Sequence, residues 1–203
     1  ALLAPEPVLL HLPAGLYNVS QSLRVPAGAN LHLVGDGGKT ILKYTGTNYG
    51  PVIGVPGPAR LTLRDLGLHG GYTNQCLEIA GCDQPGARIF LDQVDVRHAT
   101  GTGFFADGLS ALEIEAEAFY HSFCGLGVEV SGPGANGAPA SAVNLIGGAA
   151  IHNDRSYEVR AGGRLLVQDM WYETHDPQQP GFLTLNDHGS FTLHGANIAP
   201  RYS

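Results

Sequence analysis

Two strand-like patterns recur along the chain in a fixed order, and this repetition limits the fold more than any other feature. The first is an apolar residue, any residue and a second apolar residue, and it begins at Leu31, Leu61, Ile89, Leu112, Val143, Leu165 and Phe191. The second follows it in step and begins at Val52, Leu77, Phe104, Val128, Tyr157 and Leu183. A sandwich has no reason to keep such a phase, whereas a solenoid must stack each coil on the coil before it.

The stretch Ala111–Val130 shows what one coil contains. Apolar residues alternate with Glu113, Glu115 and Glu117, which places the apolar set on one face of a strand and the carboxylates on the other. A helix would spread these glutamates around its cylinder. A turn near Gly125 then leads to a second alternation, Val128–Val130.

The beginning of the chain carries a more specific motif. Residues 12–41 contain Pro13-Ala-Gly15-Leu-Tyr17, then Leu33-Val-Gly35-Asp-Gly37, then Thr40. This segment resembles the opening of the pectate-lyase-like superfamily of right-handed parallel β-helices. The resemblance implies a fold but no single activity, because that superfamily holds lyases, hydrolases, epimerases, tailspikes and non-catalytic modules. Its members usually begin with a capping helix, and no such pattern precedes this motif, so we expect a piece of a longer protein.

We therefore predict an all-β fold, a single-stranded right-handed parallel β-helix of seven or eight coils. Residues 1–203 are expected to form one domain, because the coils use the whole length. Gly and Pro fall between the strands and mark turns. The segment 131–140 is the longest loop, either a lid or a tolerated insertion.

Composition narrows the partners. The formal net charge of −7, with only 11 Lys and Arg, argues against nucleic acid. No apolar run is long enough to span a bilayer. The three cysteines cannot form a complete disulfide framework; Cys76 and Cys82 could pair across a short loop, or all three are buried free thiols. No metal site is predicted, and the sequence requires no cofactor.

Histidines recur at one point of the repeat. His98, His121 and His152 each lie nine residues after the start of the first pattern in their coil, counted from Ile89, Leu112 and Val143. We expect them to stack at one corner, about 4.8 Å apart from coil to coil. The stack is either a structural ladder or part of a polar site. Mutual repulsion would lower the pKa values of such histidines.

Carboxylates recur on the second pattern. If Val128 and Val130 point inward, then Glu129 points outward. The same parity places a full column outside, made of Ile53, Glu78, Phe105, Glu129, Glu158 and Thr184, with Arg160 beside Glu158. Two carboxylates on neighbouring coils can serve as an acid–base pair, or they are ordinary solvated glutamates.

The predicted catalytic set is Glu129, Glu158, His121, His152 and Arg160. The predicted substrate-binding set is Glu78, His98, Trp171, Tyr172 and Glu173. Either Trp171 or Tyr172 could stack on a sugar ring, and alternation means that the other one points into the core.

Three functions remain open at this level. The first is an extracellular or cell-surface module that contacts polysaccharide, with lyase or glycoside hydrolase activity on an acidic glycan. The second is a non-catalytic glycan-binding or adhesive module. The third is a structural β-helix of a surface protein, fibre or tailspike that associates with itself end to end or side by side. The sequence lacks the Asn-Thr-Asp and Arg-x-Pro-x-x-Arg signatures of the superfamily's polygalacturonases and pectate lyases, which favours the last two.

Overall fold

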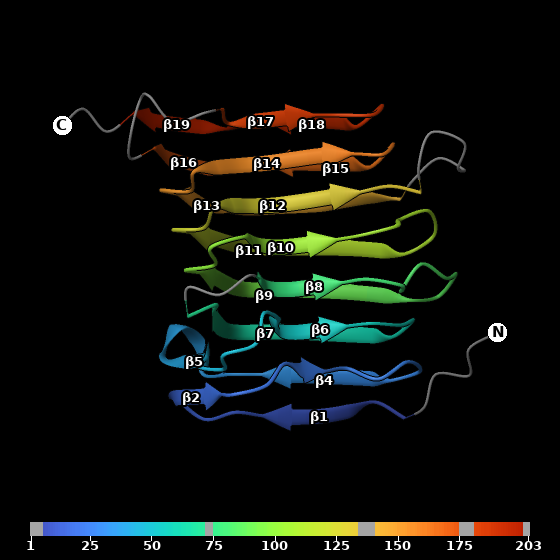
Figure 1. The fold of residues 1–203 in the computed structure, drawn as a ribbon, viewed down its shortest axis with the longest axis vertical. Coiled ribbons are helices and arrows are strands. Elements are labelled where there is room, and N and C mark those ends of the chain that lie inside the picture. Colours follow the sequence, from blue (N-terminus) through green and yellow to red (C-terminus); the bar gives the residue numbers. More distant parts are fainter. Residues whose placement is uncertain (1–5, 72–74, 134–140, 175–180, 201–203) are drawn as a thin grey trace.

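The computed structural model describes residues 6–71, 75–133, 141–174 and 181–200, and these form a parallel β-solenoid of about seven turns. Figure 1 shows the turns stacked one above another from the N-terminal to the C-terminal end. The predicted all-β parallel β-helix is confirmed. Most of the 131–140 loop lies outside the described residues.

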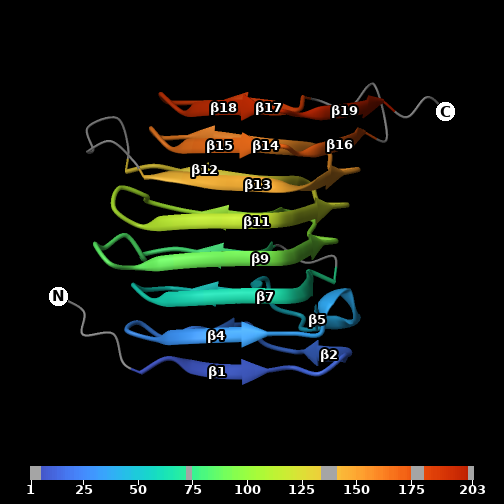
Figure 2. The same ribbon diagram turned by 180° about the vertical axis from the view of Figure 1, so that it is seen from behind.

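The opening strands stack into the larger sheet, which Figure 2 shows from behind. In order they are β1 (Val8–His11), β4 (Asn30–Val34), β7 (Arg60–His69), β9 (Arg88–Arg97), β11 (Glu113–Ser122), β13 (Ala142–Ile151), β15 (Arg164–Gln168) and β18 (Ser190–His194). Four shorter strands extend this sheet: β2 (Gly15–Val19), β5 (Thr40–Tyr44), β16 (Trp171–Thr174) and β19 (Asn197–Pro200).

The closing strands form the second sheet. They are β3 (Leu23–Arg24), β6 (Pro51–Val55), β8 (Gln75–Ile79), β10 (Thr102–Ala106), β12 (Leu126–Ser131), β14 (Arg155–Arg160) and β17 (Leu183–Leu185). One 3-10 turn, η1 (Gly37–Lys39), interrupts the strands of the described residues, and none of these residues forms a helix that could cross a membrane.

The long strands β7, β9, β11 and β13 each bend in the middle. At the bend the backbone of Asp65, Gln93, Ala118 or Gly147 takes a positive φ between 46° and 68°. The half of the strand that follows the bend therefore belongs to a different outer face from the half that precedes it. In these four coils the segments before and after the bend form one continuous strand.

Inward side chains form stacked apolar columns. One column consists of Leu33, Leu63, Leu91, Ala116, Leu145, Val167 and Leu193. The repeat assigned Leu112 as the partner of Ile89, but Ile114 pairs with Ile89, so the sequence register of this coil was wrong by two residues. Ile114 remains inward and buried.

The cause of this shift lies one coil earlier, in Asp83. One carboxylate oxygen of Asp83 accepts hydrogen bonds from the backbone N–H groups of Ser110 (2.7 Å), Ala111 (2.5 Å) and Leu112 (3.0 Å). These bonds outweigh the opposing effect of burial and lower the pKa of Asp83. Leu112 is therefore held in a turn, and β11 begins only at Glu113.

The N-terminal motif residues close the first coil. The Tyr17 hydroxyl donates to the Pro13 carbonyl (2.8 Å), and the Thr40 hydroxyl donates to the Leu12 carbonyl (3.2 Å). A glycine is required at position 35 because the backbone of Asp65 approaches it closely. A Cβ at Gly35 would lie 2.3 Å from the carbonyl oxygen of Asp65.

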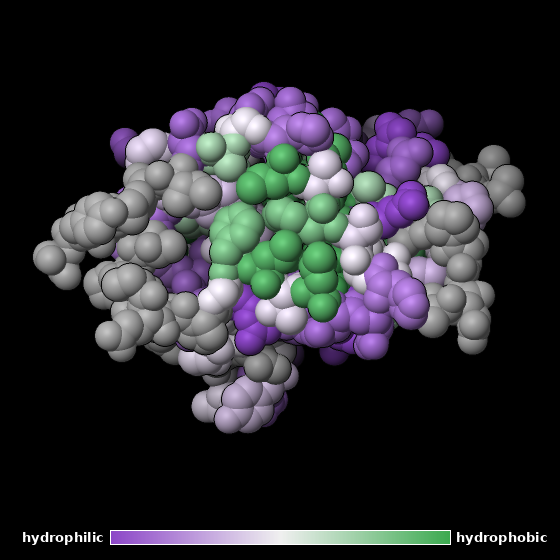
Figure 3. Space-filling model, turned by 90° about the horizontal axis from the view of Figure 1, so that it is seen from above, coloured by the Kyte–Doolittle hydropathy of each residue, from purple (hydrophilic) through white to green (hydrophobic). Residues whose placement is uncertain are grey.

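The C-terminal end of the solenoid exposes its core. Figure 3 looks down on this end and shows an apolar patch surrounded by hydrophilic residues. In the last turn Phe182 is 36% and Leu185 49% exposed, and Leu183, Phe191 and Leu193 are partly buried. The first strand is also uncovered, because its inward Leu10, which pairs with Leu33, is 49% exposed.

The three cysteines are buried free thiols, so Cys76 and Cys82 do not pair. Cys82 donates to the carbonyl of Gly57 (2.9 Å), and burial raises the pKa of its thiol to about 11. Burial likewise raises the pKa of Cys76.

Candidate functional site

The closing strands carry the predicted column of outward glutamates. Strand pairing places Glu78, Phe105, Glu129, Glu158 and Thr184 on successive coils in one register. The column continues toward the N-terminus as Gly54 and Arg24. Ile53 was wrongly assigned to it, because Ile53 pairs with inward Leu77 and is 2% exposed.

Both glutamates of the predicted catalytic set already have a cationic partner. Arg160 donates through Nε to Glu129 Oε1 (2.8 Å), and Thr102 donates to Glu129 Oε2 (3.1 Å). The Arg160 guanidinium also lies 5.8 Å from the centre of the Phe105 ring. Glu158 pairs with Arg155 on its own strand. Glu129, Glu158 and Arg160 thus lie together, and the Glu129–Arg160 ion pair links neighbouring coils.

The histidine column of the structure differs from the one predicted from the repeat. Phe123 takes the place of His121, so the corner column is His98, Phe123 and His152, with ring centroids 5.5 Å and 5.2 Å apart. His69 lies 5.7 Å from His98. Burial is the main cause of the lowered pKa values of His69 and His98, rather than mutual repulsion.

His121 points into the core and is fully buried. Asn153 Nδ2 donates to its Nδ1 (3.0 Å), which leaves Nε2–H facing the Tyr157 hydroxyl (3.4 Å). Burial lowers the pKa of His121 to about 3. The structure therefore separates His121 from the outward glutamates.

The remaining binding candidates occupy three places. Trp171 is 45% exposed, whereas Tyr172 is buried at 2%, as alternation requires. Glu173 lies beside His152, with 3.7 Å between Oε1 and Nε2. Glu78 lines a hollow of about 180 Å³ with Arg24 over Gly54.

A larger hollow lies on the opening-strand face, where no site was predicted from the sequence. Its N-terminal part has a volume of about 460 Å³ and its C-terminal part about 650 Å³. The two parts share Thr62, Arg88, Phe90 and Glu113, and we call the whole hollow the trough. It crosses five neighbouring strands, β4 to β13, a span of about 19 Å at the usual strand spacing.

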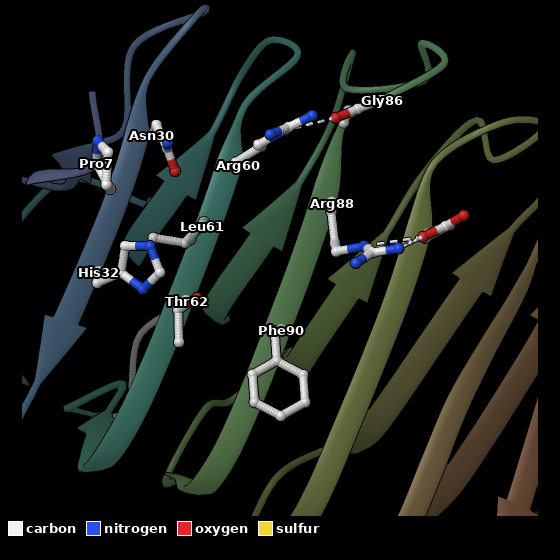
Figure 4. A pocket seen from close by; sticks show the side chains of 11 residues that line it. Pro7, Asn30, His32, Arg60, Leu61, Thr62, Gly86, Arg88 and Phe90 are labelled. Carbon is white, nitrogen blue, oxygen red and sulfur yellow. Dashed lines mark hydrogen bonds and ion pairs between the residues drawn. The ribbon is translucent and has the colours of Figure 1, made fainter. Parts of the chain in front are cut away.

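Outward residues of successive coils line the trough in two columns. The column nearer the middle of the opening strands, which we call the middle column, is His32, Thr62, Phe90, Glu115 and Asn144. The column at the start of these strands, which we call the outer column, is Asn30, Arg60, Arg88, Glu113 and Ala142. Figure 4 shows the N-terminal part, with His32, Thr62 and Phe90 on neighbouring strands. Parity along the opening strands predicts these columns, but the strand patterns alone give no sign of a hollow.

The charges of the trough are divided between its two ends. Arg60 and His32 line only the N-terminal part, and Glu115 lines only the C-terminal part. Arg88 pairs with Glu113 at the middle, and both side chains are about two-thirds exposed. Arg60 is held by a hydrogen bond from Nε to the Gly86 carbonyl (3.1 Å). The N-terminal part is therefore the cationic part.

Within the described residues, no three His, Cys, Asp or Glu side chains come close enough to hold a metal ion. Comparison with family models, with curated proteins and with solved structures returned no match.

Proposed function

We propose that the chain is a β-helix module that binds an acidic polysaccharide in the trough. The observation that carries the proposal is the open, elongated shape of the trough, which has two arginines, Arg60 and Arg88, in its outer column and the Phe90 ring in the neighbouring column. Guanidinium groups bind carboxylates in bidentate geometry, and an aromatic ring offers a surface for a sugar face.

The lining favours a hydroxyl-rich chain over other ligands. It contains Asn, His, Thr, Arg and Glu side chains with a single aromatic ring, so a lipid would leave many polar groups unpaired. Nucleic acid is disfavoured because its binding sites neutralise many phosphates, whereas only two arginines, Arg60 and Arg88, line the trough. The resemblance of residues 12–41 to the pectate-lyase-like superfamily supports a polysaccharide partner, outside the cell or at its surface.

Binding is favoured over catalysis. A lyase or hydrolase would use the paired glutamates of the closing strands, yet the side chains of Glu129 and Glu158 are only 17% and 18% exposed and each holds an arginine. The Arg88–Glu113 pair of the trough is about two-thirds exposed, so a ligand can compete for it. His121, a member of the predicted catalytic set, lies in the core. The proposal therefore assigns ligand contact to the trough and a structural role to the glutamates, of which Glu129 links two coils through Arg160.

The test compares the wild-type chain with the Arg60→Ala and Arg88→Ala variants. Their affinities for polygalacturonate and alginate are measured by affinity electrophoresis. Loss of one charged hydrogen-bonding partner, at about 1.5–3 kcal/mol, should weaken binding roughly tenfold or more. Arg164→Ala is the matched control, because Arg164 continues the outer column beyond the trough. An equal loss in Arg164→Ala would indicate non-specific attraction and contradict the proposal.

The apolar C-terminal end favours a second candidate, a structural module that associates through its ends. Leu185, 49% exposed, would then contact another chain. Leu185→Lys should abolish concentration-dependent association in sedimentation velocity without changing polygalacturonate binding. A wild-type chain that stays monomeric at high concentration would contradict this candidate.

A further inference from the structure

The small hollow on the closing-strand face extends over three neighbouring coils. It has a volume of about 180 Å³, and its charged side chains are Arg24 on β3 and Glu78 on β8. Strand pairing joins Arg24 to Gly54 on β6 and Gly54 to Glu78, so the two charges come from the coils on either side of one glycine. The backbones that carry them are therefore separated by about 9.6 Å.

Glu78 differs from the other glutamates of its column. Glu129 and Glu158 each form an ion pair with an arginine. Within the part of the chain that the structure describes, neither Glu78 nor Arg24 takes part in an ion pair. Two opposite charges therefore line one hollow without neutralising each other directly.

Gly54 keeps the space between the two charges open. It lines the hollow and has no side chain to fill it. A Cβ at this position would lie 3.2 Å from Pro51 Cγ and 3.9 Å from Glu78 Oε2, so the carboxylate of Glu78 stands beside the glycine. Any side chain larger than a methyl group at position 54 would occupy part of the hollow.

The size and the charges of the hollow fit a free amino acid. Pockets for drug-sized ligands usually have volumes of roughly 300–1,000 Å³, so this hollow takes a smaller molecule. The guanidinium of Arg24 can bind a carboxylate in bidentate geometry, and the carboxylate of Glu78 can accept hydrogen bonds from an ammonium group. A ligand with a single charge would satisfy one of these groups and be repelled by the other. Pro51, Pro56 and Ala80 add apolar surface for an aliphatic side chain.

We propose that Arg24, Gly54 and Glu78 form a binding site for an aliphatic α-amino acid. Arg24 binds the carboxylate of the ligand, Glu78 binds its ammonium group, and its side chain lies against the apolar wall. The site lies on the closing strands, whereas the trough lies on the opening strands. It therefore goes beyond the proposed binding of a polysaccharide and does not depend on it.

The experiment titrates L-leucine into the ¹⁵N-labelled protein and follows the amide signals of Gly54, Val55 and Ala80, which line the hollow. Two matched probes each lack one charge: 4-methylpentanoate has no ammonium group, and 3-methylbutylamine has no carboxylate. Leucine should give saturable shifts at these amides, with an affinity that falls at high salt. Each single-charge probe should bind at least about fivefold more weakly, the change expected for the loss of one exposed ion pair.

Two variants and a control define the site. Arg24→Gln and Glu78→Gln each remove one charge and should weaken leucine binding about fivefold. Glu117→Gln is the matched control, because Glu117 is exposed and lines neither this hollow nor the trough, and it should leave the affinity unchanged. Leucine binding that is unchanged in either Arg24→Gln or Glu78→Gln would overturn the proposal. Equal affinities for leucine and one of the single-charge probes, or the absence of saturable shifts with leucine, would overturn it as well.

Discussion

His121 illustrates how a polar residue is accommodated in the core at the scale of a single side chain. Asn153 fixes its ring from one side and the Tyr157 hydroxyl faces it from the other. Gly127 makes room for the ring, since a Cβ at that position would lie 2.2 Å from His121 Nδ1. The imidazole is held neutral, and its proton equilibrium is therefore coupled to folding.

The first prediction is a loss of stability in mild acid. Unfolded His121 binds a proton near pH 6.5, whereas the folded residue does so only near pH 3, so stability falls as pH drops from 6.5 toward 3. The loss should be about 1.4 kcal/mol per pH unit, or roughly 2 kcal/mol between pH 6.5 and 5, in urea unfolding experiments.

His121→Leu should remove most of this pH dependence. His69 and His98 remain in that variant. Because their pKa values are also lowered, the unfolding free energy should still decrease as the pH falls, but less steeply than in the wild type. A His121→Leu variant with the full wild-type slope would contradict the assignment.

At the scale of elements, the register of each coil depends on contacts from its neighbours. Leu112-Glu-Ile114-Glu-Ala116 offers two equally good starts for an alternating strand, and only the hydrogen bonds to Asp83 decide between them. Sequence repetition alone therefore misplaced His121 in the corner column.

The second prediction concerns Asp83. Asp83→Ala leaves three amide groups without their acceptor and should cost about 2–3 kcal/mol of unfolding free energy. Asp83→Asn keeps one carbonyl oxygen and should cost less. Wild-type stability of Asp83→Ala in urea unfolding would show that this turn does not set the register.

Other parts of the fold were predictable where polar residues mark the alternation. Glu129 and Glu158 lie between buried valine or tyrosine residues, and their outward direction is confirmed. Val52-Ile53-Gly54 contains no polar residue, so the direction of Ile53 was assigned wrongly. The trough was missed because a hollow depends on how side chains of five strands lie together, which alternation does not describe.

At the scale of the whole molecule, the solenoid presents three outer faces with different chemistry. The closing strands carry ion pairs, and the first halves of the opening strands carry the trough. The halves after the bend, together with β16, carry the exposed Tyr120 and Trp171. Because each face is a set of columns, a ligand can contact successive coils as a chain. The central claim is that an acidic chain uses the trough rather than the closing strands.

The most direct test is to map amide chemical-shift changes in a ¹⁵N-labelled sample titrated with an oligogalacturonate. The largest changes are expected at Thr62, Arg88 and Phe90, with little change at Glu129 and Glu158. Changes concentrated at Glu129, Glu158 and Arg160, with Thr62 and Phe90 unaffected, would contradict the account.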